Sequence, residues 1–559
     1  MVRPRILVVG GVAAGASAAA RARRMAESAE IVIFERGEEV SFANCGLPYY
    51  IAGQIQDRKK LLVAQPADFR EKFRIEVHTR HEVVRVDRQA KQVEVVNLDS
   101  GQRRREAYDK LVLAPGASPV VPPWAVLQAS NLFTLRDMTD SDRIRAYVDE
   151  HRPARAVVIG AGFIGLEMVE ALTERGAAVT LVELQPQVLP LMDAEMASRI
   201  EAVLRKHKVD VRVGVRVNAL SAEGGRVTGV RFDNGEEIPA DLVLVSVGVR
   251  PNVELAREAG LRLGPSGGIA VDELQRTSDP DICAAGDATE VVHAVLGKSV
   301  CVPLAGPANR NGRLAGQHAV TGKARPATPV AGSAIVGVFG EAAAVTGLSL
   351  KAAKQAGLDA TAVYAIGGHH AGYYPGAEQM VLKLVFDPAS RRVLGAQAVG
   401  GAGVDKRIDV IATAIRFGGT IDDLAGLDLT YAPQFGSAKD PVHIAAFVAQ
   451  NQADGLFQQI LPGEPIPPGQ VLDVRTTPEV AKGTLPGAVH ISLQTLRDNL
   501  NRLDRDRPVL VLCGIGQRAY FASRILMQSG FGDVWTLAGG YTLHKDTWPA
   551  AEQTSGSCG

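Results

Sequence analysis

The sequence predicts an α/β protein with two Rossmann-like dinucleotide-binding domains, an α+β domain and a C-terminal α/β domain. Two short apolar strands, at 5–9 and 155–159, each lead into a glycine-rich turn and a helix. Beyond about residue 326, strands and helices alternate without such a turn, which is typical of an α+β domain. The Pro/Gly-rich stretch 462–469 marks the clearest domain boundary.

Length and composition restrict the class of protein. The 559 residues allow about four domains of ordinary size. Lys+Arg and Asp+Glu both number 61, so nothing indicates a nucleic-acid or membrane partner. No apolar run is long enough for a signal peptide or a membrane span. The five cysteines are scattered, which indicates neither a disulfide framework nor a metal site and favours a reducing, cytoplasmic location.

The first glycine turn predicts a dinucleotide site. Gly10 and Gly15 lie between the strand and an Ala-rich helix over 16–26, whose N-terminus suits a phosphate. Val12 replaces the middle glycine of the G-x-G-x-x-G fingerprint, so the match is incomplete. The next strand ends in Glu35, at the distance expected for an acid that binds an adenosine ribose.

The second turn is a complete fingerprint, with Gly160, Gly162 and Gly165. Its following strand ends in Glu183. Two such units in one chain are strong evidence for two nucleotide sites. Because Glu183 would repel a 2′-phosphate, we expect NADH to be preferred over NADPH.

Other residues are expected at the same two sites. The segment 277–287 is predicted to be a strand that ends in Gly-Asp, with the acid placed to hydrogen-bond a flavin's ribityl chain. The full set of further cofactor residues is Arg36, Ala114, Gly116, Gly248, Gly286 and Asp287.

The stretch 41–50, Ser-Phe-Ala-Asn-Cys-Gly-Leu-Pro-Tyr-Tyr, contains one cysteine, Cys45. Pro48 suits the first turn of a helix, so Cys45 is predicted at a helix N-terminus, where a thiolate is stabilised. A thiolate attacks disulfide and persulfide sulfur. A lone cysteine is more often a small buried residue, but the nucleotide-binding units on either side favour the reactive interpretation.

The helix after the first turn carries Arg21, Arg23 and Arg24. On an arbitrary helix this would be a solvated basic face. Beside the Cys45 region, guanidinium groups are suited to bidentate contacts with phosphates.

The C-terminal part has a second candidate nucleophile. The strand 508–512 delivers Cys513 into the loop Cys-Gly-Ile-Gly-Gln-Arg, whose successive N–H groups predict an anion cradle. Arg518 adds positive charge, so the loop is expected to hold a thiolate and a persulfide. Cys283 and Cys301 are predicted to be core residues and Cys558 a tail residue.

Residues 1 to about 450 resemble the flavin-dependent pyridine-nucleotide disulfide reductases, and within them the single-cysteine branch of coenzyme A disulfide and persulfide reductases, through the motif around Cys45. Residues 466–549 resemble a rhodanese domain, through 473–475, 485–488 and the Cys513 loop. Ala14 departs from the expected glycine. The resemblance implies an FAD-binding domain at 1–150 and 251–325, an NAD-binding domain at 151–250, a dimerisation domain at 326–450, a linker at 451–469 and a rhodanese domain at 470–559.

The resemblance also implies a homodimer in which Tyr373 and Tyr431 approach the partner's active-site cysteine and act as hydrogen-bond or proton donors. Taken alone, each tyrosine would be structural. The residues expected to hold a coenzyme A substrate or a sulfur donor are Ser17, Arg21, Arg24, Ser41, Asn44, Asn309, Lys439 and Arg518.

The predicted function is a reductase that passes electrons from NADH through FAD and Cys45 to CoA persulfide, polysulfide or CoA disulfide, while Cys513 handles sulfane sulfur. One alternative is an NADH oxidase or peroxidase that uses a cysteine sulfenic acid. A second is a sulfur carrier or redox sensor.

Overall fold

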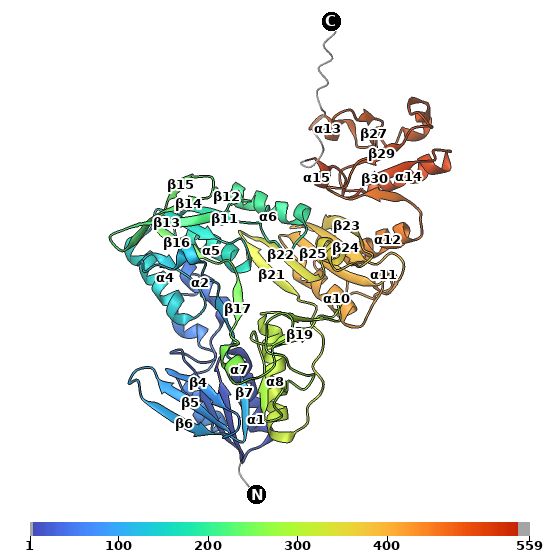
Figure 1. Cartoon of the computed structure of the whole chain (residues 1–559). Helices are drawn as coiled ribbons and strands as arrows, with labels where there is room; N and C mark the ends of the chain where they lie inside the picture. The colour runs from blue at the N-terminus through green and yellow to red at the C-terminus, as the bar shows by residue number, and fades with distance from the viewer. Residues whose placement is uncertain (1–3, 546–559) are drawn as a thin grey trace. The chain divides into compact units, whose positions relative to one another are not determined.

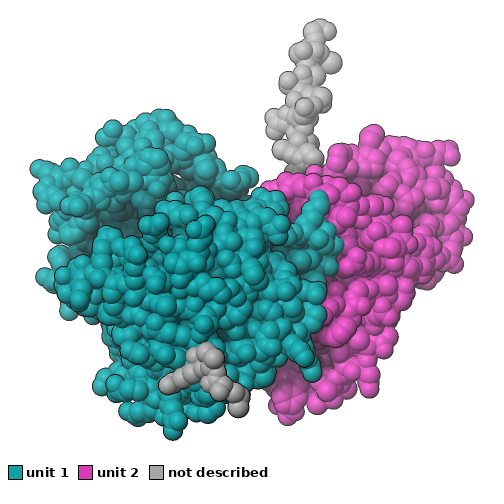
Figure 2. Space-filling model, turned by 60° about the horizontal axis from the view of Figure 1, so that its bottom comes forward, with its two compact units in different colours: residues 1–190, 200–339 teal, residues 191–199, 340–559 magenta. Residues whose placement is uncertain are grey.

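The structure is a computed structural model that describes residues 4–545. Cys558, predicted to be a tail residue, lies outside this range. The chain divides into two compact units, residues 1–190 with 200–339, and residues 191–199 with 340–559 (Figure 2). The parallel sheets and the α+β segment confirm the predicted fold class.

The first unit begins with a five-stranded parallel sheet (Figure 1). In spatial order its strands are β18 (Ile282–Ala284), β7 (Lys110–Leu113), β1 (Arg5–Val9), β2 (Glu30–Phe34) and β3 (Glu76–His78). After a partly exposed charged first residue, β1 and β2 consist of buried apolar residues, as expected where both faces of a parallel sheet are covered. Helix α1 (Ala13–Met25) packs along α8 (Ala305–Thr321).

Small residues allow these two helices to pack very closely. A Cβ on Gly312 would lie 2.2 Å from the carbonyl oxygen of Ala14, and one on Gly316 would lie 2.0 Å from that of Ala18. Both distances are shorter than any van der Waals contact, so only glycine fits. The Ala-rich sequence of α1 therefore reflects helix packing as well as helix propensity.

A second parallel sheet carries the second glycine turn. Its strands, in spatial order, are β12 (Asp210–Val213), β11 (Ala178–Glu183), β10 (Arg155–Ile159), β16 (Leu242–Val245) and β9 (Leu132–Phe133). Helix α5 (Phe163–Glu174) starts at the turn. Helix α1 likewise starts inside its turn, at Ala13, and not at residue 16 as predicted.

The second unit contains an antiparallel sheet with β22 (Glu341–Gly347), β25 (Val393–Gly400), β24 (Gln379–Phe386) and β23 (Thr361–Gly368) as neighbours in that order. Helices α10 (Val404–Arg416) and α12 (Pro441–Ala453) pack on it. β22 was not predicted from the sequence; its Glu-Ala-Ala-Ala-Val-Thr-Gly has little β-propensity by itself.

The C-terminal sheet is parallel, with strands β26 (Gln458–Ile460), β30 (Val534–Leu537), β29 (Val509–Leu512), β27 (Gln470–Asp473) and β28 (Val489–His490) in spatial order. The segment 451–469 is therefore not a free linker. It holds the end of α12 and β26, and β26 pairs with β30. Within residues 4–545, no helix is both long and apolar enough to cross a membrane.

Candidate active site and nucleotide sites

Close backbone packing explains the glycines of the first turn. Gly10 has φ 90°. A Cβ there would lie 2.2 Å from the Ala114 carbonyl oxygen, and one on Gly15 would lie 1.8 Å from the Gly10 carbonyl oxygen. The strand therefore passes tightly into α1, and no side chain caps the start of this helix by a hydrogen bond, which leaves N–H groups there available to a diphosphate. The residues fit a dinucleotide.

In each of the two glycine-turn motifs, the acid at the end of the second strand accepts hydrogen bonds from two main-chain N–H groups. Glu35 accepts hydrogen bonds from the N–H groups of Gly11 and Gly37, both at 2.7 Å. Glu183 accepts them from Ala161 and Gln185, both at 2.8 Å. Gly11 was not predicted, because it is not a fingerprint position; its value as a donor appears only when strand and turn are folded together.

The second turn repeats the first in detail. A Cβ on Gly160 would lie 2.2 Å from the Ser246 carbonyl oxygen, and one on Gly165 would lie 2.0 Å from the Gly160 carbonyl oxygen. Nothing lies within 4 Å of a Cβ on Gly162, which caps α5. The protein's own packing therefore does not require glycine at 162, whereas close approach of a phosphate would.

Most of the other predicted cofactor residues follow strands of the first sheet, whereas Gly248 follows β16 of the second sheet. Gly286 has φ 88°, and its Cβ would be 2.9 Å from that of Ala14. Asp287 accepts a hydrogen bond from Arg136 at 3.1 Å. Arg136 was not predicted, since no motif contains it. Of the remaining residues, Arg36 is exposed and Ala114 is half-buried. Gly116 and Gly248 have positive φ angles.

Cys45 is exposed and lies in the short 3₁₀ turn η1 (Asn44–Gly46), directly before α2 (Leu47–Ala52). The predicted position at a helix start is confirmed, with Pro48 in the first turn. The expected stabilisation of the thiolate by the helix start is opposed by other groups around the sulfur. Partial desolvation of the sulfur, together with the carboxylates of Glu167 and Asp287, raises the pKa of the Cys45 thiol.

Glu167, on α5, is the carboxylate that sequence reasoning could not place. It accepts a hydrogen bond from the Tyr49 hydroxyl at 3.1 Å. Desolvation and this carboxylate raise the pKa of Tyr49 to about 12, so the phenol remains protonated. Tyr49 is four residues after Cys45, and the two side chains influence one another electrostatically.

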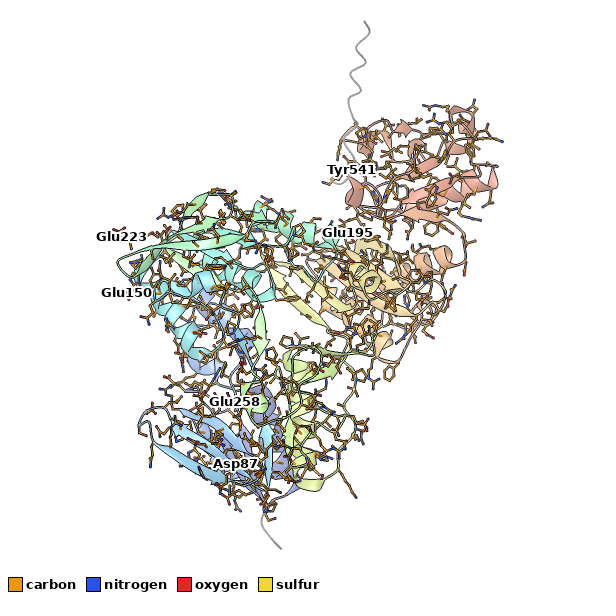
Figure 3. All side chains as sticks on the ribbon, in the orientation of Figure 1. Asp87, Glu150, Glu195, Glu223, Glu258 and Tyr541 are labelled. Carbon is orange, nitrogen blue, oxygen red and sulfur yellow. The ribbon has the colours of Figure 1, made fainter. Side chains whose placement is uncertain are left out.

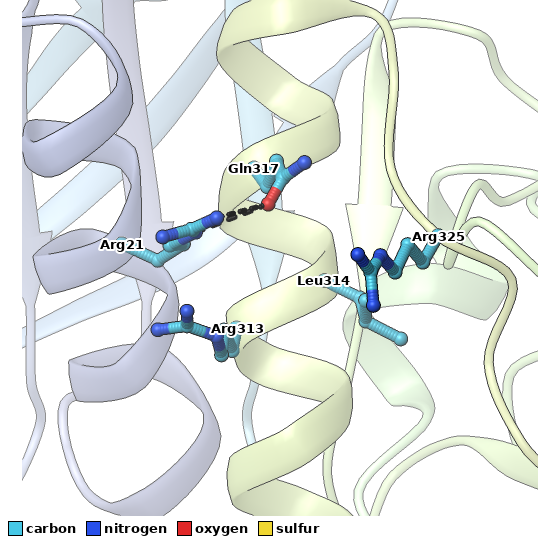
Figure 4. Close-up of a pocket in the computed structure, with 5 residues that line it drawn as sticks. All are labelled: Arg21, Arg313, Leu314, Gln317 and Arg325. Carbon is cyan, nitrogen blue, oxygen red and sulfur yellow. Dashed lines mark hydrogen bonds between the residues drawn. The ribbon is translucent and has the colours of Figure 1, made fainter.

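A basic pocket of about 510 Å³ lies where α1 and α8 meet (Figure 4). It is lined by Arg21, Arg313, Leu314, Gln317 and Arg325. Arg21 donates two hydrogen bonds to Gln317, at 3.1 and 2.5 Å. Partial desolvation and the neighbouring cations Arg313 and Arg24 lower the pKa of Arg21. Like charges held this close indicate a site for an anion.

The three predicted arginines of α1 have different environments. Arg21 lines the pocket, and Arg24 is exposed and donates to the Ala20 carbonyl. Arg23 is buried and donates to main-chain carbonyls, including those of Phe73 and Ala29, so it is structural.

Four other predicted substrate residues are in the first unit. Ser17 and Asn309 are on α1 and α8, and Ser41 and Asn44 are in the segment that leads to Cys45. Ser17 donates a 2.7 Å hydrogen bond to Asn309 and so joins α1 to α8. Ser41 has φ 47°, and the Asn44 amide is 3.5 Å from the Arg136 carbonyl.

Tyr373 and Tyr431, in the second unit, are brought together by two loops. Their hydroxyls are 3.0 Å apart, although 76% and 49% of the residues remain exposed. The hydrogen bond to Tyr431 raises the pKa of Tyr373. Lys439 is exposed near the end of the second loop.

A buried ion pair fixes these loops. Arg407 is 1% exposed and donates to Asp440 at 2.7 Å and to the His369 carbonyl at 2.7 Å. The Ala371 N–H donates to the Gly436 carbonyl. Arg407 therefore connects the segment before Tyr373 to the segment after Tyr431.

Cys513 follows β29 and is fully buried. Its sulfur accepts a hydrogen bond from the Gly516 N–H at 3.1 Å. Arg518 is in the first turn of α14 (Gln517–Gln528) and is paired with Glu479, which no local motif indicated. Among the described residues, no group of three or more His, Cys, Asp or Glu is arranged to hold a metal ion.

Comparison with known proteins relates these sites to a family. Residues 4–309 match the pyridine nucleotide-disulphide oxidoreductase family, 333–441 its dimerisation domain and 457–546 the rhodanese-like domain. A coenzyme A disulfide reductase of Staphylococcus aureus is 34% identical over 80% of this chain and 100% of its own length.

Two solved structures cover almost the whole chain. Reduced CoADR-RHD of Bacillus anthracis is 41% identical, with a TM-score of 0.93 over 98% of this chain and 99% of the other. An NAD-dependent persulfide reductase of A. fulgidus is 40% identical, with a TM-score of 0.91 over 96% of this chain and 99% of its own.

The alternative of an NADH oxidase has weaker support. A water-forming NADH oxidase of Lactobacillus brevis is 29% identical and covers 81% of this chain, with a TM-score of 0.77. Both glycine turns and both acids, Glu35 and Glu183, lie within the residues that match the family. The chain belongs to the pyridine nucleotide-disulphide oxidoreductases, enzymes that use FAD and NADH, and it carries a rhodanese-like domain at its C-terminal end.

Proposed function

We propose that the protein reduces sulfur carried by coenzyme A, with CoA persulfide as the main substrate and CoA disulfide and polysulfide as further acceptors. The observation that carries this is the pocket of Arg21, Arg313 and Arg325 in the same unit as Cys45. A nucleotide with several phosphates needs such a cluster, whereas oxygen or peroxide does not.

Cys45 is the nucleophile. Its thiolate attacks the inner sulfur of the persulfide, CoA–S–SH, and displaces hydrosulfide, so that a mixed disulfide of Cys45 and coenzyme A remains. The turn from Gly10 to Gly15 and Glu35 would hold FAD, which would supply the two-electron transfer from NADH that reduces this disulfide. The sum is CoA–SSH + NADH + H⁺ → CoA–SH + H₂S + NAD⁺. Because Cys45 has no cysteine neighbour in the sequence, the substrate thiol is the second sulfur of the disulfide.

The other residues bind and orient. Gly10, Gly15, Glu35 and Asp287 are assigned to FAD, and Gly160, Gly162, Gly165 and Glu183 to NADH. Glu183 favours NADH because its carboxylate would lie against a 2′-phosphate. Higher kcat/KM with NADPH than with NADH would contradict that assignment.

The active unit is a homodimer in this proposal. The matched dimerisation domain, residues 333–441, contains both Tyr373 and Tyr431. Each tyrosine hydroxyl is assigned to donate a hydrogen bond to the leaving sulfur at Cys45 of the partner subunit. A monomer that retains full turnover would contradict this part of the proposal.

The test is steady-state NADH oxidation with CoA persulfide, CoA disulfide, polysulfide, oxygen and peroxide. Arg21→Ala and Arg313→Ala are expected to raise KM for CoA persulfide on the order of tenfold each, the loss of one charge-assisted hydrogen bond. Turnover of glutathione persulfide, which has no phosphate, should not change. Arg70→Ala, at an exposed arginine outside the pocket, is the control. Highest kcat/KM with oxygen or peroxide would instead favour the oxidase.

A further inference from the structure

The ion pair between Arg518 and Glu479 lies beside the Cys513 loop. Arg518 donates from both terminal nitrogens to the two carboxylate oxygens of Glu479, at 2.8 and 2.6 Å. A Cβ on Gly514 would lie 3.6 Å from Arg518 and 4.0 Å from Glu479. Both charges are therefore next to the residue that follows the nucleophile.

Glu479 is held firmly in its charged form. It also accepts hydrogen bonds from the N–H and hydroxyl of Thr476, at 2.9 and 2.7 Å. The hydrogen bonds from Arg518 and Thr476 hold the pKa of Glu479 well below its usual range. At neutral pH the pair thus has no net charge.

A second arginine near the loop is neutralised in the same way. Arg475 is 4% exposed and donates to the fully buried Asp473 at 3.0 and 2.7 Å. Its guanidinium lies 4.2 Å from the ring centre of Tyr541, and the Tyr541 N–H donates to the Cys513 carbonyl. Tyr541 is labelled in Figure 3. Both arginines whose contacts reach this loop are therefore paired with carboxylates.

We propose that Glu479 sets the sulfur-donor specificity of the Cys513 site, which accepts sulfane sulfur from a thiol persulfide and discriminates against dianionic thiosulfate. This rests on the proposed function in one respect, that the C-terminal domain handles sulfane sulfur. The persulfide group that reacts at Cys513 carries at most one negative charge, and any other charges of the donor lie away from its sulfur atoms. Thiosulfate carries two, and its approach gains little from an arginine whose charge is already cancelled.

The transfer is balanced for either donor. The Cys513 thiolate attacks the outer sulfur, the donor's S–S bond breaks, and the Cys513 persulfide forms. The electron pair of the broken bond leaves with a thiolate when the donor is a persulfide, and with sulfite when the donor is thiosulfate. No external oxidant or reductant is needed, so the step proceeds without NADH.

The experiment uses the full-length FAD-loaded chain with Cys45→Ser, in which the reductase reaction is blocked. Glutathione persulfide or thiosulfate is added without NADH, and intact mass reports the gain of one sulfur atom over time. Cys513→Ser in the same background identifies the loaded residue. Glu479→Gln removes the charge, and glutamine still suits the capping position at the start of α13 (Thr477–Val480). Asp498→Asn removes one exposed charge of the same domain and serves as the control.

We expect glutathione persulfide to load Cys513 faster than thiosulfate does. Glu479→Gln should raise the thiosulfate rate on the order of tenfold and leave the persulfide rate within about twofold. Added salt should slow thiosulfate loading in Glu479→Gln but have little effect in the chain that retains Glu479. Faster loading by thiosulfate in the unsubstituted site, or strong salt inhibition of it there, would overturn the proposal without any need for the variant to fold. Since NADH turnover is not measured, failure here is separate from failure of the reductase function.

Discussion

At the scale of single residues, the environment of Cys45 is the main departure from expectation. A helix start favours a thiolate, but nearby carboxylates and desolvation oppose it, and the pKa is raised. The chain therefore favours the protonated thiol until a substrate or a cation changes the balance. Of the two acids, Glu167 and Asp287, Glu167 on α5 is the one through which this effect can be tested, because Asp287 is also assigned to FAD.

We predict that Glu167→Gln lowers the pKa of Cys45, because it removes a negative charge that disfavours the thiolate. The pH profile of Cys45 alkylation in the oxidised holoenzyme should move to lower pH, on the order of one pH unit or less for one partly solvated charge. Iodoacetamide labelling of the Cys45 peptide, followed by mass spectrometry, measures it. Glu174→Gln, an exposed position on the same helix, should leave the profile in place. A shift to higher pH would show that Glu167 stabilises the thiolate.

The paired hydroxyls of Tyr373 and Tyr431 lead to a second prediction at this scale. Tyr373→Phe and Tyr431→Phe should each slow the sulfur half-reaction about tenfold to a hundredfold and leave reduction of the flavin by NADH unchanged. Because the two hydroxyls share a hydrogen bond, the double variant should lose less than the product of the single losses. Stopped-flow absorbance separates the half-reactions, and Tyr374→Phe removes a neighbouring hydroxyl as the control. A loss confined to the NADH half-reaction would exclude this role.

At the scale of secondary-structure elements, the contact between α1 and α8 packs two helices of the first unit and also forms the basic pocket. The glycines of α8 set how closely the helices approach, and two of the pocket arginines, Arg21 and Arg313, come from the two helices. A change in the spacing of the helices therefore changes the geometry of the basic pocket. Stability and binding of a phosphate-bearing substrate should respond together.

We predict that Gly316→Ala destabilises the first unit by about 1–3 kcal/mol, the usual cost of overpacking. On helix propensity alone, alanine in place of a helical glycine would stabilise. The steric conflict with the Ala18 carbonyl outweighs this gain. Urea unfolding and KM for CoA persulfide measure the two effects. Gly306→Ala, in the first turn of the same helix, meets only the flexible end of Arg310 and should be nearly neutral. Equal stability of both variants would contradict the packing argument.

Much of the fold could be predicted from local patterns. β1, β2 and β10 are short aliphatic runs that end at breakers, and the glycine turns after β1 and β10 determine where the next helices begin. β26 could not be recognised, because its three residues gain their stability from pairing with β30. The acids Glu167 and Glu479 and the Arg407–Asp440 pair were missed for a related reason. Each acts on a site through residues distant in sequence, and no local spacing records such contacts.

At the scale of the whole molecule, the two ends of the chain carry separate sulfur chemistry. Cys513→Ser should leave NADH-dependent reduction of CoA persulfide nearly intact, within about twofold, since the pocket and Cys45 suffice for that substrate. It should reduce turnover severalfold with glutathione persulfide, which lacks the phosphates that the pocket binds and needs a carrier. NADH-coupled rates with both donors test this. Equal loss with both would place Cys513 on an obligatory path, and no loss with either would mean that the domains act independently.

The fixed position of Glu183 affects how such an enzyme could change its coenzyme during evolution. If Glu183 excludes the 2′-phosphate as proposed, accepting NADPH requires the loss of this carboxylate, but the same group accepts hydrogen bonds from the N–H groups of Ala161 and Gln185. Its removal would leave the buried N–H group of Ala161 unpaired, at a cost of about 1–3 kcal/mol. A lineage that drifts toward NADPH must therefore first acquire stabilising substitutions elsewhere, or a replacement acceptor at this turn. A change of coenzyme at this position would therefore also change the stability of the fold.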